Sequence, residues 1–70
     1  MASDDAGLAG EVLEQLPSGL YRVRLDAGVV VIAHPTAPAA RNFVRILVGD
    51  RVRVELSRVN AGRGRIVGRL

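Results

Sequence analysis

Arginine side chains on extended segments are the residues of this chain best suited to chemistry, and that chemistry is the binding of a polyanion. Residues 51–56 read Arg-Val-Arg-Val-Glu-Leu after a Gly-Asp turn, so charged and aliphatic side chains alternate as they do on a half-buried strand. Residues 62–69 read Gly-Arg-Gly-Arg-Ile-Val-Gly-Arg, which is again basic and extended, and glycine lets a backbone approach a partner closely. Together the two segments predict a β-surface that presents guanidinium groups to a polyanion.

Charge is unevenly distributed along the chain. Residues 1–33 carry two arginines against five acids, whereas residues 34–70 carry eight arginines against two acids, and the net charge of the chain is +3. A GC-rich coding bias could account for the use of arginine in place of lysine throughout, but it does not explain the clustering in the second half. The clustering favours a nucleic-acid partner.

The residue types exclude most catalytic and metal-binding chemistry. The chain has no cysteine and a single histidine, His34, which cannot form a zinc site with a few scattered acids. There is no close pair of carboxylates in an apolar setting, and no glycine loop followed by Lys and Ser or Thr that could hold a nucleotide phosphate. We therefore expect a protein that is not an enzyme and needs no metal or cofactor.

Length and composition predict one small domain. A chain of 70 residues buries only about 60% of its unfolded surface, so the core must be economical. Residues 1–7 are small and acidic and predict a flexible tail, which leaves residues 8–70 as a single domain. The start lacks the features of a secretory signal, and the longest aliphatic run, residues 29–33, is far shorter than a membrane span. A cytoplasmic protein without membrane contact is expected.

The elements that would position the arginines are five short strands and one short helix. Alternating polarity and turn residues predict strands at 8–16, 20–25, 29–33, 51–57 and 64–69, with a turn at 17–19 and a hairpin at 26–28. The spacing of Phe43, Ile46 and Leu47 predicts a helix within 39–47 that covers an open end of the sheet. This order predicts an all-β fold, a five-stranded closed OB-fold barrel with a short helix between strands three and four.

Alternation also predicts which side chains form the core. Val52, Val54 and Leu56 should face inward together, and Tyr21 should do so with its apolar neighbours on the second strand. Phe43 is in register with apolar residues as well, so neither aromatic ring is expected to be a platform for stacking bases.

Six short segments stand in a specific order over nearly the whole chain. They are Gly10-x-Val12, Tyr21-Arg22-Val23, Ala33-His34, Arg41-Asn42-Phe43-Val44-Arg45-Ile46, Gly49-Asp50-x-Val52-x-Val54-Glu55-Leu56 and Gly64-Arg65-Ile66-Val67. Each segment is common by itself, but together and in this order they resemble bacterial translation initiation factor one, a member of the S1-like OB-fold family.

The resemblance implies a function in translation initiation. A protein of this family binds the small ribosomal subunit at the decoding region of the A site, contacts ribosomal RNA and a ribosomal protein, and cooperates with the other initiation factors. It would keep tRNA from entering that site prematurely, and it would act as a monomer. The matching positions implied to contact RNA are Arg41, Asn42, Arg45, Arg63, Arg65, Arg69 and, with a structural role as its alternative, His34.

Departures from the family pattern keep alternatives open. Residues 37–40 read Ala-Pro-Ala-Ala where the family has a basic Gly-Lys-Met-Arg-Lys-like run, and Gly68 replaces a usual aromatic residue. The chain is therefore either the main factor or a divergent or second copy. A small SH3-like or OB barrel that serves as a ribosomal or protein-interaction module is the alternative function. Solubility explains Arg22, Arg24, Arg51 and Arg53 better than RNA binding does, because the exteriors of barrel strands are commonly charged.

Overall fold

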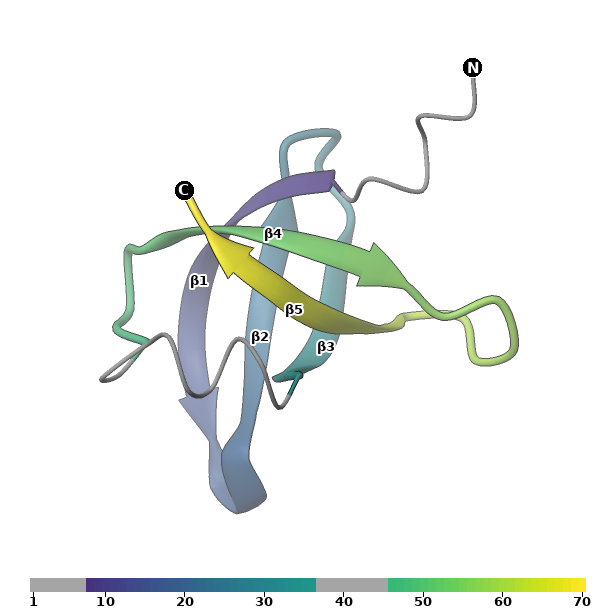
Figure 1. Cartoon of the computed structure of the whole chain (residues 1–70), viewed down its shortest axis with the longest axis horizontal. Helices are drawn as coiled ribbons and strands as arrows, with labels where there is room; N and C mark the ends of the chain where they lie inside the picture. Colours follow the sequence, from purple (N-terminus) through teal and green to yellow (C-terminus); the bar gives the residue numbers. More distant parts are fainter. Residues whose placement is uncertain (1–7, 37–45) are drawn as a thin grey trace.

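Five strands form a closed β-barrel in the computed structural model, which describes residues 8–36 and 46–70 (Figure 1). The strands are β1 (Leu8–Leu16), β2 (Leu20–Leu25), β3 (Val30–Pro35), β4 (Arg51–Leu56) and β5 (Arg63–Arg69), and a 3-10 turn, η2 (Pro17–Gly19), joins β1 to β2. The predicted five-stranded closed barrel is confirmed. The bounds of β1 and β2 agree with the sequence prediction, whereas β3 continues through Pro35 and β5 begins one residue earlier.

The order of strands around the barrel is β1-β2-β3-β5-β4, and β4 returns to β1. Four of the five pairings are antiparallel, and the pairing of β3 with β5 is parallel. Closure gives each strand two hydrogen-bonded neighbours, which removes the exposed edges that an open sheet would present.

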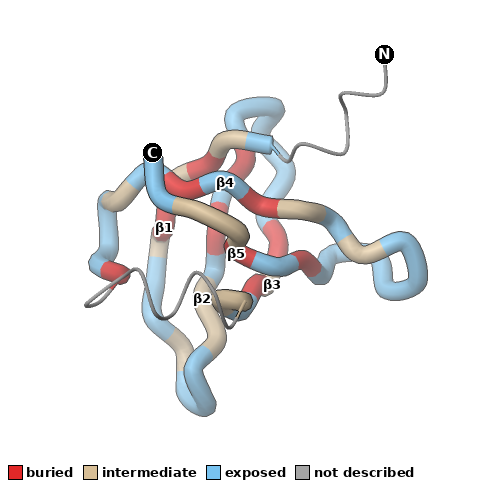
Figure 2. Tube along the Cα trace, in the orientation of Figure 1, coloured by how far each residue is buried: buried red, intermediate tan, exposed pale blue. Residues whose placement is uncertain are grey.

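Aliphatic side chains from every strand form the core of the barrel. Figure 2 marks the buried positions along the strands. The largest fully buried side chains belong to Val12, Val23, Val52, Val54 and Ile66. Tyr21 is partly buried and packs against this core, as predicted. The prediction for Leu56 is wrong, because its side chain is 46% exposed where β4 leaves the barrel and the loop to β5 begins.

A bulge on β5 changes which of its side chains share a face. Arg53 lies opposite Gly68, but the next pair joins Val54 to Ile66, so one residue of β5 is left over between them. An extra residue of this kind reverses the alternation beyond it. As a result Arg69 lies opposite the inward-facing Val52.

The predicted helix within 39–47 falls mostly on residues 37–45, which lie outside the described part of the chain, as does the predicted tail at 1–7. Ile46 and Leu47 are described, and they are not helical. Ile46 is buried in the core as predicted, whereas the prediction for Leu47 is wrong because that side chain is 51% exposed. A turn begins at Leu47, whose backbone N–H donates to Asp50 Oδ2 at 2.9 Å and whose carbonyl accepts from the Asp50 N–H at 3.0 Å.

Two glycines allow neighbouring strands to approach more closely than a side chain would permit. A Cβ atom on Gly64 would lie 2.8 Å from the carbonyl oxygen of Glu55 on β4, and one on Gly10 would lie 2.8 Å from the carbonyl oxygen of Arg24 on β2. Both obstacles are backbone atoms, which cannot rotate away. Gly68 differs, since nothing lies within 4 Å of the corresponding position.

We expect Gly64→Ala to lower the free energy of unfolding by about 1–3 kcal/mol, the usual effect of forcing atoms into a filled site. Gly68→Ala on the same strand should leave it nearly unchanged. Chemical denaturation of the two variants measures the difference. Equal losses would show that the close approach at Gly64 does not constrain the fold.

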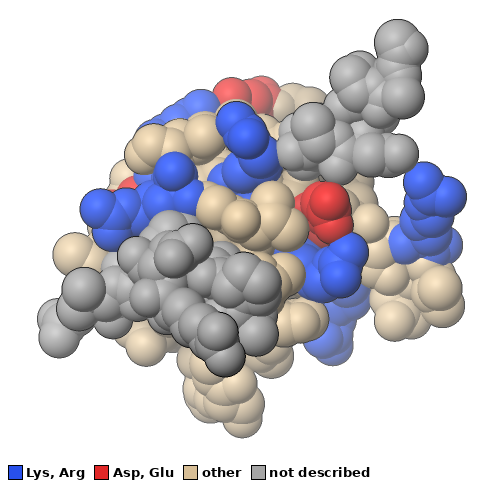
Figure 3. Space-filling model, viewed as in Figure 1, with Lys and Arg blue, Asp and Glu red and all other residues tan. Residues whose placement is uncertain are grey.

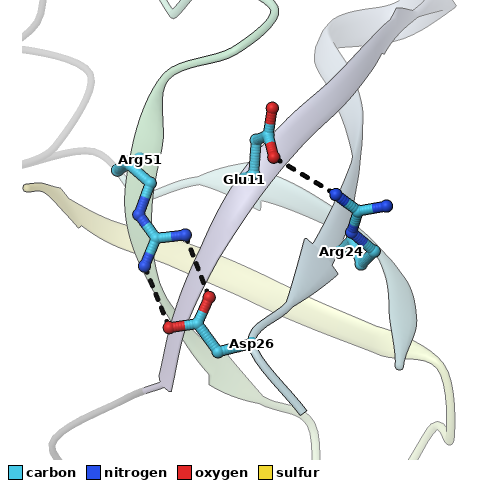
Figure 4. A network of polar contacts seen from close by, with 4 residues as sticks. All are labelled: Glu11, Arg24, Asp26 and Arg51. Atoms are coloured by element: carbon cyan, nitrogen blue, oxygen red, sulfur yellow. Dashed lines mark hydrogen bonds and ion pairs between the residues drawn. The ribbon is translucent and has the colours of Figure 1, made fainter. Parts of the chain in front are cut away.

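A network of ion pairs on the outside of the barrel joins the β2–β3 turn to β4 (Figure 4). Both terminal nitrogens of Arg51 donate to the Asp26 carboxylate at 2.9 Å, and Arg24 donates to Glu11 at 3.3 Å. The bidentate hydrogen bond from Arg51 lowers the pKa of Asp26 below its ordinary value. Because Asp26 and Arg51 are about half exposed, solvent screens the pair.

The lowered pKa of Asp26 predicts a small acid sensitivity. A depressed carboxylate pKa contributes stability above the ordinary value, and this contribution is lost as the pH falls below about 4 through the folded-state pKa. Asp26→Asn should therefore lower the melting temperature at about pH 7, and this deficit should shrink as the pH is lowered toward about 2 and the wild-type carboxylate takes up a proton. Thermal melts across this range check the prediction, and Glu14→Gln serves as a control. An Asp26→Asn deficit of the same size at both ends of the range would contradict it.

Candidate nucleic-acid interface

An open groove of about 820 Å³ lies where β3, β5 and the end of β4 meet the β4–β5 loop. Aliphatic side chains from four strands contribute to its lining, and three of the arginines also line it. The aliphatic residues include Leu8, Leu20, Ile32 and Leu56, and the basic residues are His34, Arg58, Arg63 and Arg65. The groove therefore combines apolar surface with a concentration of positive charge.

Strand register brings the basic residues together. In the parallel pair, Ile32 of β3 lies beside Arg63 of β5, and His34 lies beside Arg65. On the other side of β5, Arg65 lies opposite Glu55 of β4. Residues that are neighbours across strands share a face of the sheet, so His34, Arg65 and Glu55 form one row across three strands.

The loop at residues 57–62 is held by short-range hydrogen bonds at the rim of the groove. Ser57 Oγ accepts from the backbone N–H groups of Val59 and Asn60 at 3.1 and 2.9 Å. The Ser57 N–H donates to the Arg63 carbonyl at 2.9 Å, and the Gly62 carbonyl accepts from the Ile32 N–H at 2.8 Å. These bonds fix both ends of the loop to the barrel and so position Arg58 and Arg63 at the groove.

Ion pairs neutralise several arginines outside the groove. There Arg22 pairs with Glu14 at 3.3 Å, Arg24 with Glu11 and Arg51 with Asp26. Inside the groove Arg65 pairs with Glu55 at 2.6 Å, while Arg63 has no ion pair with a described residue. Figure 3 shows arginine surface in several places over β4, β5 and their loop, with acidic surface beside part of it. The excess positive charge of the described residues thus gathers on the β4–β5 side.

The structure unites three of the residues predicted to contact RNA. His34, Arg63 and Arg65 all line the groove. Arg69 does not, because the bulge places it across from Val52 and it stands six residues beyond Arg63, about 20 Å along β5. The other predicted positions, Arg41, Asn42 and Arg45, lie outside the described residues.

Sequence reasoning missed the loop and aliphatic part of the groove. Arg58 and Asn60 line it, and the only signal available was their position in a predicted loop between two basic strands. The exposed Leu56 could not be found by alternation, which predicts an inward side chain. Tyr21 is the one Phe, Tyr or Trp residue in the described ranges and it packs against the core, so those ranges offer no exposed Phe, Tyr or Trp ring for base stacking.

Residues 8–36 and 46–70 lack the features of a metal site and of a membrane-spanning helix. No three His, Asp or Glu side chains in these ranges gather closely enough to hold a metal ion. Within the same ranges no helix has the length and apolar character needed to cross a membrane.

Comparison with known proteins finds no matching family model but several similar proteins. The chain is 46% identical over 61 residues to the chloroplastic translation initiation factor IF-1 of Buxus microphylla and also to that of Asarum canadense. Each match covers 87% of this chain and 79% of the relative. The chloroplastic translation initiation factor IF-1 of Solanum lycopersicum is 44% identical over 61 residues, and there the match covers 87% of this chain but only 39% of the longer relative.

A solved structure has the same fold. The solution structure of translation initiation factor one from the Wolbachia endosymbiont strain TRS of Brugia malayi aligns with a TM-score of 0.70 and 38% sequence identity. The alignment covers 100% of this chain and 88% of that chain.

The geometry predicts which arginines matter for binding a single-stranded oligonucleotide. Arg63→Ala combined with Arg65→Ala should weaken binding and reduce the slope of log K against log salt by about 1.4, since each of the two phosphate contacts on a single strand contributes about 0.7. Arg24→Ala combined with Arg51→Ala removes the same charge outside the groove and should have a smaller effect. Fluorescence anisotropy with an oligouridylate at several salt concentrations checks this. Equal effects of the two pairs would argue that net charge alone is responsible.

Proposed function

Because the chain belongs to the translation initiation factor IF-1 family, we propose that it binds the small ribosomal subunit through the groove of β3, β4 and β5. One observation carries the proposal: strand register brings His34, Arg63 and Arg65 together in this groove. The arginines of β2, in contrast, are paired with acids outside the groove. Guanidinium groups on a rigid sheet suit the phosphate backbone of folded RNA.

The groove would supply affinity mainly through phosphate contacts. Arg63 has no ion pair with a described residue, so it can bind a phosphate directly. Arg65 must first break its ion pair with Glu55 before it can bind a phosphate. The aliphatic surface of Leu8 and Leu56, which is 42% and 46% exposed, would cover part of a ribose or base. Without an exposed Phe, Tyr or Trp ring in the described ranges, phosphate pairing is the larger contribution.

We place this contact at the decoding region of the A site, with ribosomal RNA and a ribosomal protein as neighbours. There the bound factor occludes premature tRNA entry and assists the other initiation factors. Arg41, Asn42 and Arg45, for which the family resemblance implies RNA contacts, would extend the surface. Arg69 would make a separate contact, since β5 carries it away from the groove.

The protein would act as a monomer wherever its small subunits are. We propose the bacterial cytoplasm as that compartment, although the plant relatives are named chloroplastic and so belong to an organelle. Their names favour an initiation factor over an enzyme, and also over the SH3-like interaction module that the sequence left as the alternative.

Small subunits purified from a bacterium test the proposal directly. Wild-type protein should bind with an affinity that falls linearly in log K against log salt, with a slope of about 0.7 to 0.9 for each phosphate it neutralises. Chemical footprinting should show protection of ribosomal RNA at the decoding region. Arg63→Ala with Arg65→Ala should weaken the protection and leave the melting temperature nearly unchanged, since exposed arginines contribute little to folding.

The Arg24→Ala with Arg51→Ala variant is the control for charge. Binding that does not depend on salt would contradict the electrostatic part of the proposal. Protection elsewhere on the subunit, with the decoding region unchanged, would refute the proposed location.

A further inference from the structure

The pairing of Glu55 with Arg65 places a carboxylate inside the groove proposed to bind RNA. Arg65 Nη2 donates to Glu55 Oε1 at 2.6 Å, and both residues line the groove. The ion pairs of Arg22, Arg24 and Arg51 differ, because they use acids that do not line it. A carboxylate repels phosphate and occupies the guanidinium that phosphate would use.

The fold fixes this pair more firmly than exposure alone would suggest. Glu55 and Arg65 are direct neighbours across β4 and β5. At the next residue, Gly64, the absence of a side chain lets the two backbones approach, since a Cβ there would lie 2.8 Å from the Glu55 carbonyl oxygen. Strand register therefore presents the carboxylate to Arg65 before any ligand arrives, at little further cost in ordering.

We propose that Glu55 is a built-in competitor for the phosphate that Arg65 binds, and that it limits the affinity of the groove for RNA. This inference rests on the proposed function of the groove. In the free protein the Arg65 guanidinium is held by Glu55, and an RNA phosphate must displace the carboxylate. Breaking the Glu55–Arg65 ion pair costs binding free energy, and only an RNA that also contacts Arg63 and the rest of the groove regains it. Glu55 therefore disfavours the binding of unrelated RNA and speeds the dissociation of bound RNA.

The chain supplies a closely matched control for this inference. Glu11 pairs with Arg24 at 3.3 Å outside the groove, with side-chain exposures of 39% and 54%. Glu55 and Arg65 have exposures of 35% and 57%. Neutralising either glutamate changes the net charge equally and leaves one arginine without its acid, but only Glu55→Gln does so inside the groove.

Glu55→Gln should tighten binding to small subunits about two- to fivefold near 0.1 M salt, the range expected when an exposed ion pair no longer competes. The slope of log K against log salt should change little, because Arg65 contacts the same phosphate in both proteins. Glu11→Gln should change neither quantity appreciably. In an Arg65→Ala background, Glu55→Gln should lose most of its effect, since there is no guanidinium left to release.

Equal gains from Glu55→Gln and Glu11→Gln would overturn the inference in favour of a net-charge effect. Unchanged or weaker binding by Glu55→Gln, with an unchanged melting temperature, would overturn it too and would indicate a direct contact between Glu55 and RNA. The same variants are measured with an oligouridylate. If wild-type protein binds no small subunits, the proposed function fails, yet a gain on the oligouridylate confined to Glu55→Gln would still establish the competition.

Discussion

The parallel pairing of β3 with β5 is the interaction on which the rest of the structure depends. It joins residues far apart in the chain, such as Ile32 and Arg63, and it closes the barrel between its third and fifth strands. Closure buries the inward side chains Val31, Ala33 and Ile66 in one core. The same register sets the outward side chains, so the bonds that complete the barrel also assemble the row that contains His34 and Arg65. The core and the row of basic side chains therefore have a common origin.

Acidic residues of β1 and of the β2–β3 turn pair with the arginines on one side of this barrel. On β2 and at the start of β4, each of Arg22, Arg24 and Arg51 has an acid within 3.3 Å. Such exposed pairs contribute little to stability individually, but they leave little net charge on that side. The excess charge remains near the β4–β5 loop, where it can attract a polyanion over a distance comparable to the Debye length. A modest net charge of +3 is thus compatible with a strongly directional surface.

Much of the barrel could be predicted from the sequence because alternation reports burial directly. Val23 and Leu25 on β2, and Val52 and Val54 on β4, are buried as their spacing indicates. The method failed at Leu56, where the strand leaves the barrel and an apolar side chain no longer has a core to enter. It also failed at Leu47, where the hydrogen bonds of Asp50 form a turn that helical spacing does not reveal. The groove could be predicted only in part, since Arg63 and Arg65 were found on it but the place of Arg69 depends on a bulge in β5 that polarity cannot show.

The ion-pair partners of the arginines could not be predicted from the sequence either, because an ion pair such as that of Arg65 with Glu55 depends on the register between strands. Sequence composition predicts that an RNA-binding surface exists. Register determines which charges of that surface already have a partner, so the number of arginines alone does not set how strongly a small basic barrel attracts a polyanion.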